Sequence, residues 1–310
     1  MRVIGLQDRE KSRLSRRSFA TLALSGLAVS GVSGLARAQG ARPPAGDYAI
    51  EKLDGVKFTR ATRITNNWLP MKPGTRYTYE GTTVEDDEKL VPHKIVLNIT
   101  DLVKDIGGVP NLVSYDLDYS DNELVEAELV FFAQDDNGNA WRFGEYPEEY
   151  EDGKFKRAPA WIHGYEGAHA GIMMTATPKL DTPSYSQGYG PAVDWTDRAT
   201  TYKMGLEVSV RYGQYKNVMV VRETSKAEVA INAFQLKYYA EGVGNIKVGW
   251  EGSGEKTKET LELTAVDTLS PKELAAIRNK ALALEKSAYT RSKKVYAPTT
   301  PSKRMTAAKA

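Results

Sequence analysis

Apolar and polar residues alternate along most of the chain after residue 55. The apolar positions in these runs are rich in β-branched and aromatic side chains, and Gly, Asn and Asp stand between the runs. This pattern is typical of short β-strands separated by turns. The predicted strands are residues 76–80, 94–99, 112–119, 124–132, 200–210, 217–224, 234–240, 244–250 and 257–266.

The connections between these strands predict their direction. Residues 107–108, 120–122, 136–138 and 151–153 are short and carry the residues of tight turns, so they favour antiparallel hairpins over crossovers. No helical period of useful length occurs between residues 56 and 268, which disfavours a doubly wound α/β fold. We therefore expect a mainly β protein: an antiparallel meander of about ten strands, curled as a half-barrel or barrel.

One helix is expected after the strands, over residues 271–289. Ser270 supplies an N-cap, Pro271 fits the first helical position and Glu273 completes a capping box. Apolar residues three or four apart give this helix one face to lay on the sheet. Residues 290–310 carry six basic residues and no acid, and we expect them to be a disordered tail.

The first 38 residues have the pattern of an export signal. A basic stretch is followed by SRRSFA at residues 15–20, which resembles the twin-arginine signature, and then by a short apolar run diluted with Ser and Gly. Small residues at Ala36 and Ala38 predict cleavage after Ala38. The sequence thus predicts export by the twin-arginine translocase to the periplasm, with no stable membrane span.

The predicted mature chain divides simply. Residues 39–54 contain Pro, Gly and Ala and are expected to be a flexible leader, and residues 55–289 are expected to form a single β-rich domain. Taking residues 1–38 away leaves 35 basic and 38 acidic residues, a formal charge near −3, so nothing indicates a nucleic-acid partner.

The absence of cysteine excludes several chemistries. Disulfides, iron–sulfur clusters, thiolate zinc, blue copper and thiol nucleophiles all need cysteine, and the chain has none. The sequence also lacks the motifs of serine hydrolase elbows, zinc proteases, phosphate-binding loops and dinucleotide sites. We therefore expect no cofactor, and the sequence favours binding over catalysis.

Aromatic residues gather in the middle of the chain, between residues 141 and 195. Tyr and Trp on long loops over a curved sheet could line a groove for a ligand, because they present large amphipathic surfaces. The same residues could instead pack a small core of their own. The predicted ligand-binding residues are Trp161, Tyr165, Tyr185, Tyr189 and Trp195.

Two alternatives rest on other side chains. His163 and His169 with Met173 could suit copper, although their spacing matches no rigid ligand pair, so no metal site is predicted. Six acids between residues 116 and 128 are expected on a solvated face of two neighbouring strands, but a hydrolase could take its carboxylate pair from them. These acids are Asp116, Asp118, Asp121, Glu123, Glu126 and Glu128.

Seven short motifs stand out along the chain: LPMKPGT at 69–75, YTYEGTT at 77–83, FAQD at 132–135, GNAWRFGE at 138–145, IMMTATP at 172–178, YGQYKNV at 212–218 and YYAEGV at 238–243. They resemble the motifs of a widespread family of uncharacterised exported bacterial β-rich proteins. The resemblance implies a β-rich exported protein and brings no catalytic residue with it. His163 and His169 are not part of the family's motifs.

Taken together, the sequence favours an exported binding or interaction protein. Its curved sheet would hold an apolar or sugar-like ligand, or a segment of a partner protein. The alternatives are an exported hydrolase with paired carboxylates and a copper-handling protein.

Overall fold

The computed structural model describes residues 49–85 and 88–305, and within them sixteen strands form one antiparallel sheet. The export signal predicted for residues 1–38 lies outside the described residues, as does most of the leader. The long strands are β1 (Thr75–Val84), β2 (Leu90–Ile106), β3 (Val109–Ser120), β4 (Glu123–Gln134), β5 (Ala140–Glu151), β11 (Arg198–Val210), β12 (Gly213–Thr224), β13 (Phe234–Ala240), β14 (Gly244–Glu251) and β15 (Thr260–Thr268). The short strands are β6 (Lys154–Arg157), β7 (Trp161–Ile162), β8 (His169–Met174), β9 (Tyr185–Ser186), β10 (Gly188–Tyr189) and β16 (Lys303–Arg304).

Tight turns join neighbouring strands at the places that the sequence predicts. Asp121 and Asn122 link β3 to β4 with φ of 49° and 66°, and Gly107 and Gly108 link β2 to β3 with φ of 61° and 82°. Two successive residues with positive φ match the right-handed twist of a hairpin, which is why Gly, Asn and Asp occupy these positions. The antiparallel meander follows from these local choices.

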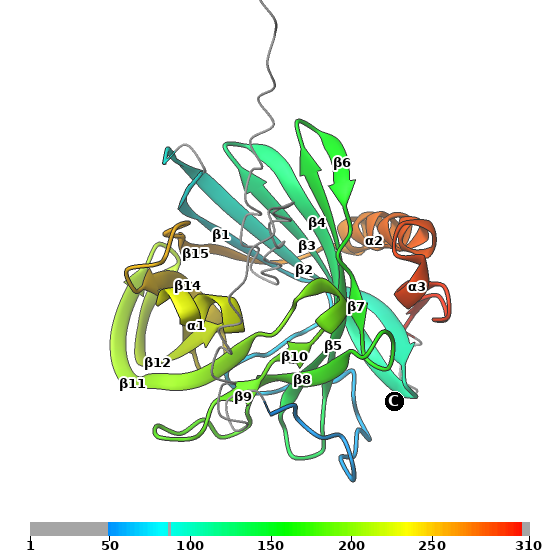
Figure 1. The fold of residues 1–310 in the computed structure, drawn as a ribbon, viewed down its shortest axis with the longest axis horizontal. Coiled ribbons are helices and arrows are strands. Elements are labelled where there is room, and N and C mark those ends of the chain that lie inside the picture. Colours follow the sequence, from blue (N-terminus) through cyan, green and yellow to red (C-terminus); the bar gives the residue numbers. More distant parts are fainter. Residues whose placement is uncertain (1–48, 86–87, 306–310) are drawn as a thin grey trace, which may run out of the picture.

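The sheet curls but does not close. Its strand order is β10-β8-β5-β4-β3-β2-β1-β15-β14-β13-β12-β11-β9, and no strand pairing within the described residues joins its two ends. Strands β1 to β5 form one wall and β11 to β14 curve away as the other, with β7 to β10 between them (Figure 1). The predicted curled antiparallel meander is confirmed, in its open form.

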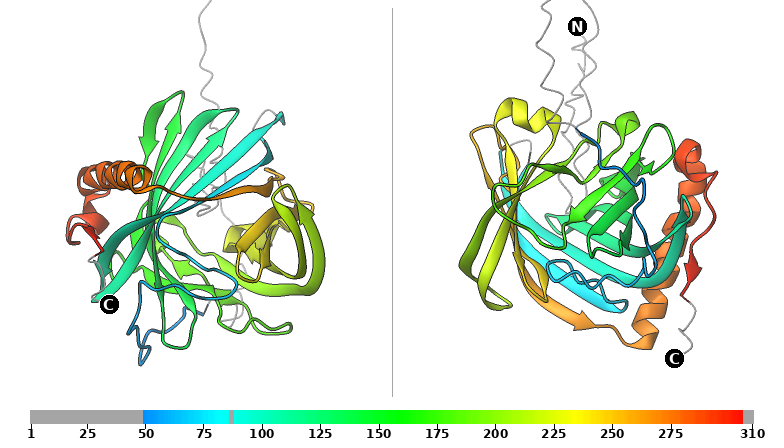
Figure 2. Two further views of the ribbon diagram at one scale, coloured as in Figure 1. Left: turned by 180° about the vertical axis from the view of Figure 1, so that it is seen from behind. Right: turned by 90° about the horizontal axis from the view of Figure 1, so that it is seen from below.

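The outer face of the β2–β4 wall is covered by helix α2 (Pro271–Arg291), as Figure 2 shows. Ser270 and Glu273 form the predicted capping box, with Glu273 N donating to Ser270 Oγ at 3.3 Å. Ile277 and Ala281 of α2 pack in one buried cluster with Phe131 of β4. Within the described residues, no helix combines the length and the hydrophobicity of a membrane-spanning segment.

The segment after α2 differs from the prediction of a disordered tail as far as Met305. Helix α3 (Lys293–Tyr296) buries Val295 and Tyr296, and β16 pairs with β2 through Lys303 and Val103. The prediction was wrong here because it rested on the excess of basic residues. The apolar residues between those charges bury enough surface to order the segment.

A short helix, α1 (Lys226–Ile231), was not predicted. Ser225 and Glu228 form a capping box around its first turn, with Ser225 N donating to Glu228 Oε2 at 2.7 Å. The spacing of these two residues is the signal for a helix start. The six residues that follow are too few to show a helical period.

Candidate functional site

The inner face of the curled sheet carries buried acids from two neighbouring strands. These acids form two directly opposed cross-strand pairs, Asp116 with Glu128 and Asp118 with Glu126. Their exposed fractions are between 1% and 8%. The expectation of a solvated face was wrong for all four, because the sheet curls over that face. It holds for Asp121 and Glu123, which lie exposed at the hairpin end.

Burial raises the pKa of two of these acids, Asp116 and Glu128. Removal from water raises the pKa of Asp116 to about 7, although the Ser114 hydroxyl and the Arg142 guanidinium pull it down. Burial, and then Glu145 and Glu126, raise the pKa of Glu128 well above its usual range. Carboxyl groups in such surroundings exchange protons near neutral pH or stay protonated, which is common in functional sites.

Arg142 of β5 is the cation whose charge acts on Asp116 and Glu128. Its Nη1 donates to Glu145 Oε2 at 3.2 Å, and its Nη2 lies 3.3 Å from the sulfur of Met173. The guanidinium carbon is 5.3 Å from the ring centroid of Trp195. Arg142 is 3% exposed, so its charge is held inside the protein by a carboxylate and an aromatic face.

A second buried ion pair faces Arg142 from the other wall. Lys237 Nζ of β13 lies 2.6 Å from Glu223 Oε2 of β12. Gln187 Nε2 donates to Glu223 Oε1 at 2.8 Å and lies 3.6 Å from the sulfur of Met173. The thioether of Met173 therefore connects the two ion pairs across the interior.

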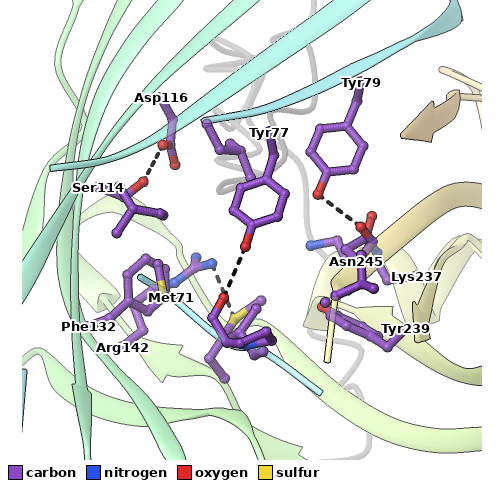
Figure 3. Close-up of a pocket in the computed structure, with 17 residues that line it drawn as sticks. Met71, Tyr77, Tyr79, Ser114, Asp116, Phe132, Arg142, Lys237, Tyr239 and Asn245 are labelled. Atoms are coloured by element: carbon purple, nitrogen blue, oxygen red, sulfur yellow. Dashed lines mark hydrogen bonds between the residues drawn. The ribbon is translucent and has the colours of Figure 1, made fainter. Parts of the chain in front are cut away.

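A cavity of about 70 Å³ reaches both ion pairs (Figure 3). Most of its lining is aliphatic or aromatic. Its polar lining residues are Ser114, Asp116, Arg142, Lys237 and Asn245, and its aromatic ones are Tyr77, Tyr79, Phe132 and Tyr239. A cavity of roughly 150 Å³ accepts benzene, so this one has room for a few heavy atoms. It is suited to a very small molecule or to one end of a larger one.

One side of the cavity is covered by the segment before β1. Tyr77 of β1 donates through its hydroxyl to Pro70 O at 3.3 Å, and Gly242 N donates to Asn67 O at 2.7 Å. Leu69, Pro70 and Tyr77 are partly exposed, whereas Asp116 and Arg142 are buried. The cavity thus has an apolar outer side and a polar inner side.

Asn245 of β14 adds an unusual acceptor to this lining. Its side-chain Oδ1 is buried and has no hydrogen-bond partner among the described residues. Its side-chain nitrogen Nδ2 donates to Lys247 O at 3.2 Å, and Tyr79 donates through its hydroxyl to the backbone oxygen of Asn245 at 2.9 Å. A buried amide oxygen without a donor is costly, and a ligand or water that donates to it would remove that cost.

The five aromatic residues predicted to bind a ligand lie elsewhere. Trp161 and Trp195 are buried with ring centroids 4.8 Å apart, and a Cβ on Gly188 would come within 2.8 Å of both rings. Tyr185 is 8% exposed, while Tyr165 and Tyr189 are half-buried. Among the described residues, the cavity lining includes none of the five. Their role in binding stays a prediction.

The histidine pair considered for copper is only partly brought together. The ring centroids of His163 and His169 are 6.1 Å apart, and Ala170 N donates to His163 Nδ1 at 3.2 Å. Met173 points its sulfur toward Arg142 and Gln187. No group of three or more His, Cys, Asp or Glu within residues 49–85 and 88–305 is arranged to hold a metal ion.

Of the polar residues of the cavity, the sequence pointed only to Asp116, as one of six candidate acids. Arg142 stands in the motif GNAWRFGE, and Lys237 and Asn245 stand in predicted strands, with no local signal for a site. A signal was available at Asp116 and its neighbours, since an acid at every second position of a strand puts several acids on one face. No local signal shows that this face turns inward.

Comparisons with known proteins give a distant likeness in structure. No family model matches the chain, and no curated protein matches it. A protein from Bacteroides fragilis NCTC 9343, named for export and for a YmcC-like fold, is similar with 11% identity and a TM-score of 0.38; the match covers 65% of this chain and 99% of that one. A protein from Parabacteroides distasonis ATCC 8503, named as a lipoprotein, is similar with 10% identity and a TM-score of 0.31, over 65% and 99% of the two chains. At this degree of likeness neither structure says what this protein binds.

Proposed function

We propose that this protein is an exported binding protein whose curled sheet takes the apolar end of a small ligand, or of a partner segment, into its interior. The observation that supports this is the cavity, in which an apolar lining surrounds a few polar groups. Small-molecule sites commonly combine these two features. Asp116 and Asn245 would fix the orientation of the bound group.

The size of the cavity favours a small or narrow group over a whole sugar ring. About 70 Å³ holds a few heavy atoms. A sugar would also need a hydrogen bond for each of its hydroxyls, and most lining side chains are apolar. The predicted aromatic residues would act from behind the site, as Trp195 does where its ring supports Arg142.

Substituting Val243 with tryptophan is expected to abolish ligand binding by filling the partly exposed side of the cavity. The measurement is an NMR screen of short alcohols, amines, carboxylic acids and monosaccharides, followed through the amide signals of Gly244 and Asn245. The matched control is Val229→Trp, because Val229 is 50% exposed on α1. We expect at least one compound to shift these signals in the native protein and in Val229→Trp, but not in Val243→Trp. If no compound does so, the cavity is not a binding site.

A hydrolase is the second candidate, supported by the opposed acids on β3 and β4. Burial raises the pKa of Asp116 to about 7 and that of Glu128 well above its usual range, and acid–base catalysts often have such shifted carboxyls. However, Asp116 lines the cavity and Glu128 does not. A substrate there would reach one carboxyl of the pair, so binding is the better-supported function.

The route of export is also a proposal, since residues 1–38 lie outside the described residues. Changing Arg16 and Arg17 together to lysine is expected to leave the precursor in the cytoplasm of a bacterial host, because the translocase recognises the paired arginines. Cell fractionation measures this, and the mass of the exported native chain should correspond to a start at Gln39. Arg9 and Arg13 changed together to lysine serve as the control. Normal export of the Arg16/Arg17 variant would exclude this route.

A further inference from the structure

The two cations that line the cavity are already neutralised by acids outside its lining. Arg142 is paired with Glu145 at 3.2 Å and Lys237 with Glu223 at 2.6 Å. Asp116 accepts hydrogen bonds from the uncharged Ser114 hydroxyl and the backbone of Asn98, and it shares the single charge of Arg142 with Glu145. The charge that the cavity can still offer to a ligand is therefore negative.

The two tyrosine hydroxyls and Asn245 also favour a ligand that donates hydrogen bonds. Tyr77 and Tyr79 use their hydroxyl hydrogens on the backbone oxygens of Pro70 and Asn245. Asn245 Oδ1 is buried and has no donor among the described residues. A bound group that donates a hydrogen bond would satisfy this oxygen, and an ionised carboxylate cannot donate one.

Aromatic rings complete this environment. Tyr77, Tyr79, Phe132 and Tyr239 all line the cavity, and the face of an aromatic ring attracts positive charge. A hydroxyl would satisfy the acceptors, but only a cation gains from the carboxylate and the rings as well. We propose that the ligand's polar end is a protonated primary amine on a short apolar chain, bound between Asp116 and Asn245. This proposal rests on the cavity being the binding site.

The proposal has a consequence for pH. Asp116 must be ionised to hold an ammonium group, and burial raises its pKa to about 7. The titratable and charged groups that interact with it are Tyr79 of β1, Glu128 of β4 and Arg142 of β5. Glu145 is paired with Arg142, and Lys237 of β13 lines the same cavity. An alkylamine stays protonated well above pH 8, as lysine does. Binding of an amine should therefore strengthen as the pH rises from 6 to 8.

Three probes of equal length and different charge test the proposal: n-propylamine hydrochloride, 1-propanol and sodium propionate, at constant ionic strength. Each is titrated into the native protein while the amide signals of Asn245 and Gly244 are recorded by NMR. We expect propylamine to bind about tenfold more tightly than propanol, and propionate to show no saturable shift. The affinity for propylamine should rise severalfold between pH 6 and pH 8, and that for propanol should stay constant.

Asp116→Asn is expected to weaken propylamine binding about tenfold and to leave propanol binding unchanged. The control is Asp121→Asn, the same change at an exposed position of the same hairpin. If propanol or propionate binds as well as the amine, or if amine affinity in the native protein is independent of pH, the amine proposal fails while the cavity stays a binding site. The pH series needs no variant, so it decides even if Asp116→Asn does not fold. If none of the wider set of compounds binds, the proposed function itself fails.

Discussion

Replacing Glu285 with alanine is expected to lower the free energy of unfolding by about 3–5 kcal/mol. The reason is Lys104 of β2, whose side chain is completely buried beneath α2. Its Nζ lies 3.0 Å from Glu285 Oε1, donates to Thr300 O at 2.8 Å and sits 4.3 Å from the ring centroid of Tyr296. Without Glu285 the ammonium group would stay buried with no opposite charge beside it.

The same carboxylate also fixes the end of the chain. Ser302 donates to Glu285 through its backbone nitrogen at 3.1 Å and through its hydroxyl at 2.8 Å. We therefore expect α3 and β16 to loosen in the variant, which hydrogen exchange of residues 293–304 would detect. The loss of stability itself is measured by urea unfolding.

Two further variants separate charge burial from lost packing. Adding Lys104→Met to Glu285→Ala should recover part of the lost stability, because no charge then remains buried. Glu207→Ala is the control, since Glu207 pairs with Lys216 on the surface and such pairs contribute about 0–1 kcal/mol. If Glu285→Ala costs no more than Glu207→Ala, the buried pair does not hold α2 to the sheet.

The protein is also expected to lose about 3–5 kcal/mol of stability as the pH rises from 6.5 to 10, through His93 of β2. His93 Nε2 lies 2.7 Å from Asp118 Oδ1 and its Nδ1 lies 3.1 Å from Glu259 Oε1. Burial alone would lower the pKa of His93, but Asp118 and then Glu259 outweigh it and raise the pKa to about 10. The folded protein therefore holds this proton more tightly than the unfolded chain, whose histidine titrates near pH 6.5.

The direction of the effect follows from that difference. Below pH 6.5 both states are protonated and the full stabilisation is present, whereas above pH 10 neither is and it is lost. Urea unfolding at pH 6.5, 8 and 9.5 measures the slope. His93→Gln should remove most of the slope, and His169→Gln, at an exposed histidine, should retain it. A native protein whose stability is constant over this range would show that His93 is not held as an imidazolium ion.

Much of the local structure could be predicted because its causes are local. The turn between β3 and β4 needs two residues that accept positive φ, and Asp121 and Asn122 are such residues. The start of α2 depends on Ser270 and Glu273, three positions apart. The prediction for the C-terminal segment was wrong because basic charge is visible in the sequence, whereas the burial of Tyr296 also depends on Tyr146, which is distant in the sequence.

The candidate site shows where sequence reasoning stops. The aromatic residues chosen from their abundance mostly pack inside the protein, and the cavity is lined by residues from several distant strands, among them Tyr79, Asp116, Arg142 and Asn245. Their meeting depends on the curl of the sheet. A count of aromatic residues along the chain carries no information about that curl.

The sequence by itself determined the antiparallel strands, the turns between them and helix α2 after the last long strand. The signals for these elements are the alternation of apolar and polar residues, the turn residues and the helix caps, and each acts over only a few residues. Only the tertiary structure decided which face of β3 and β4 became the interior. An acid at every second position looks the same whether that face meets water or a second wall. The second wall is joined to the first by pairings between strands far apart in the sequence, such as Thr82 of β1 with Thr260 of β15. No short stretch of sequence specifies such a pairing.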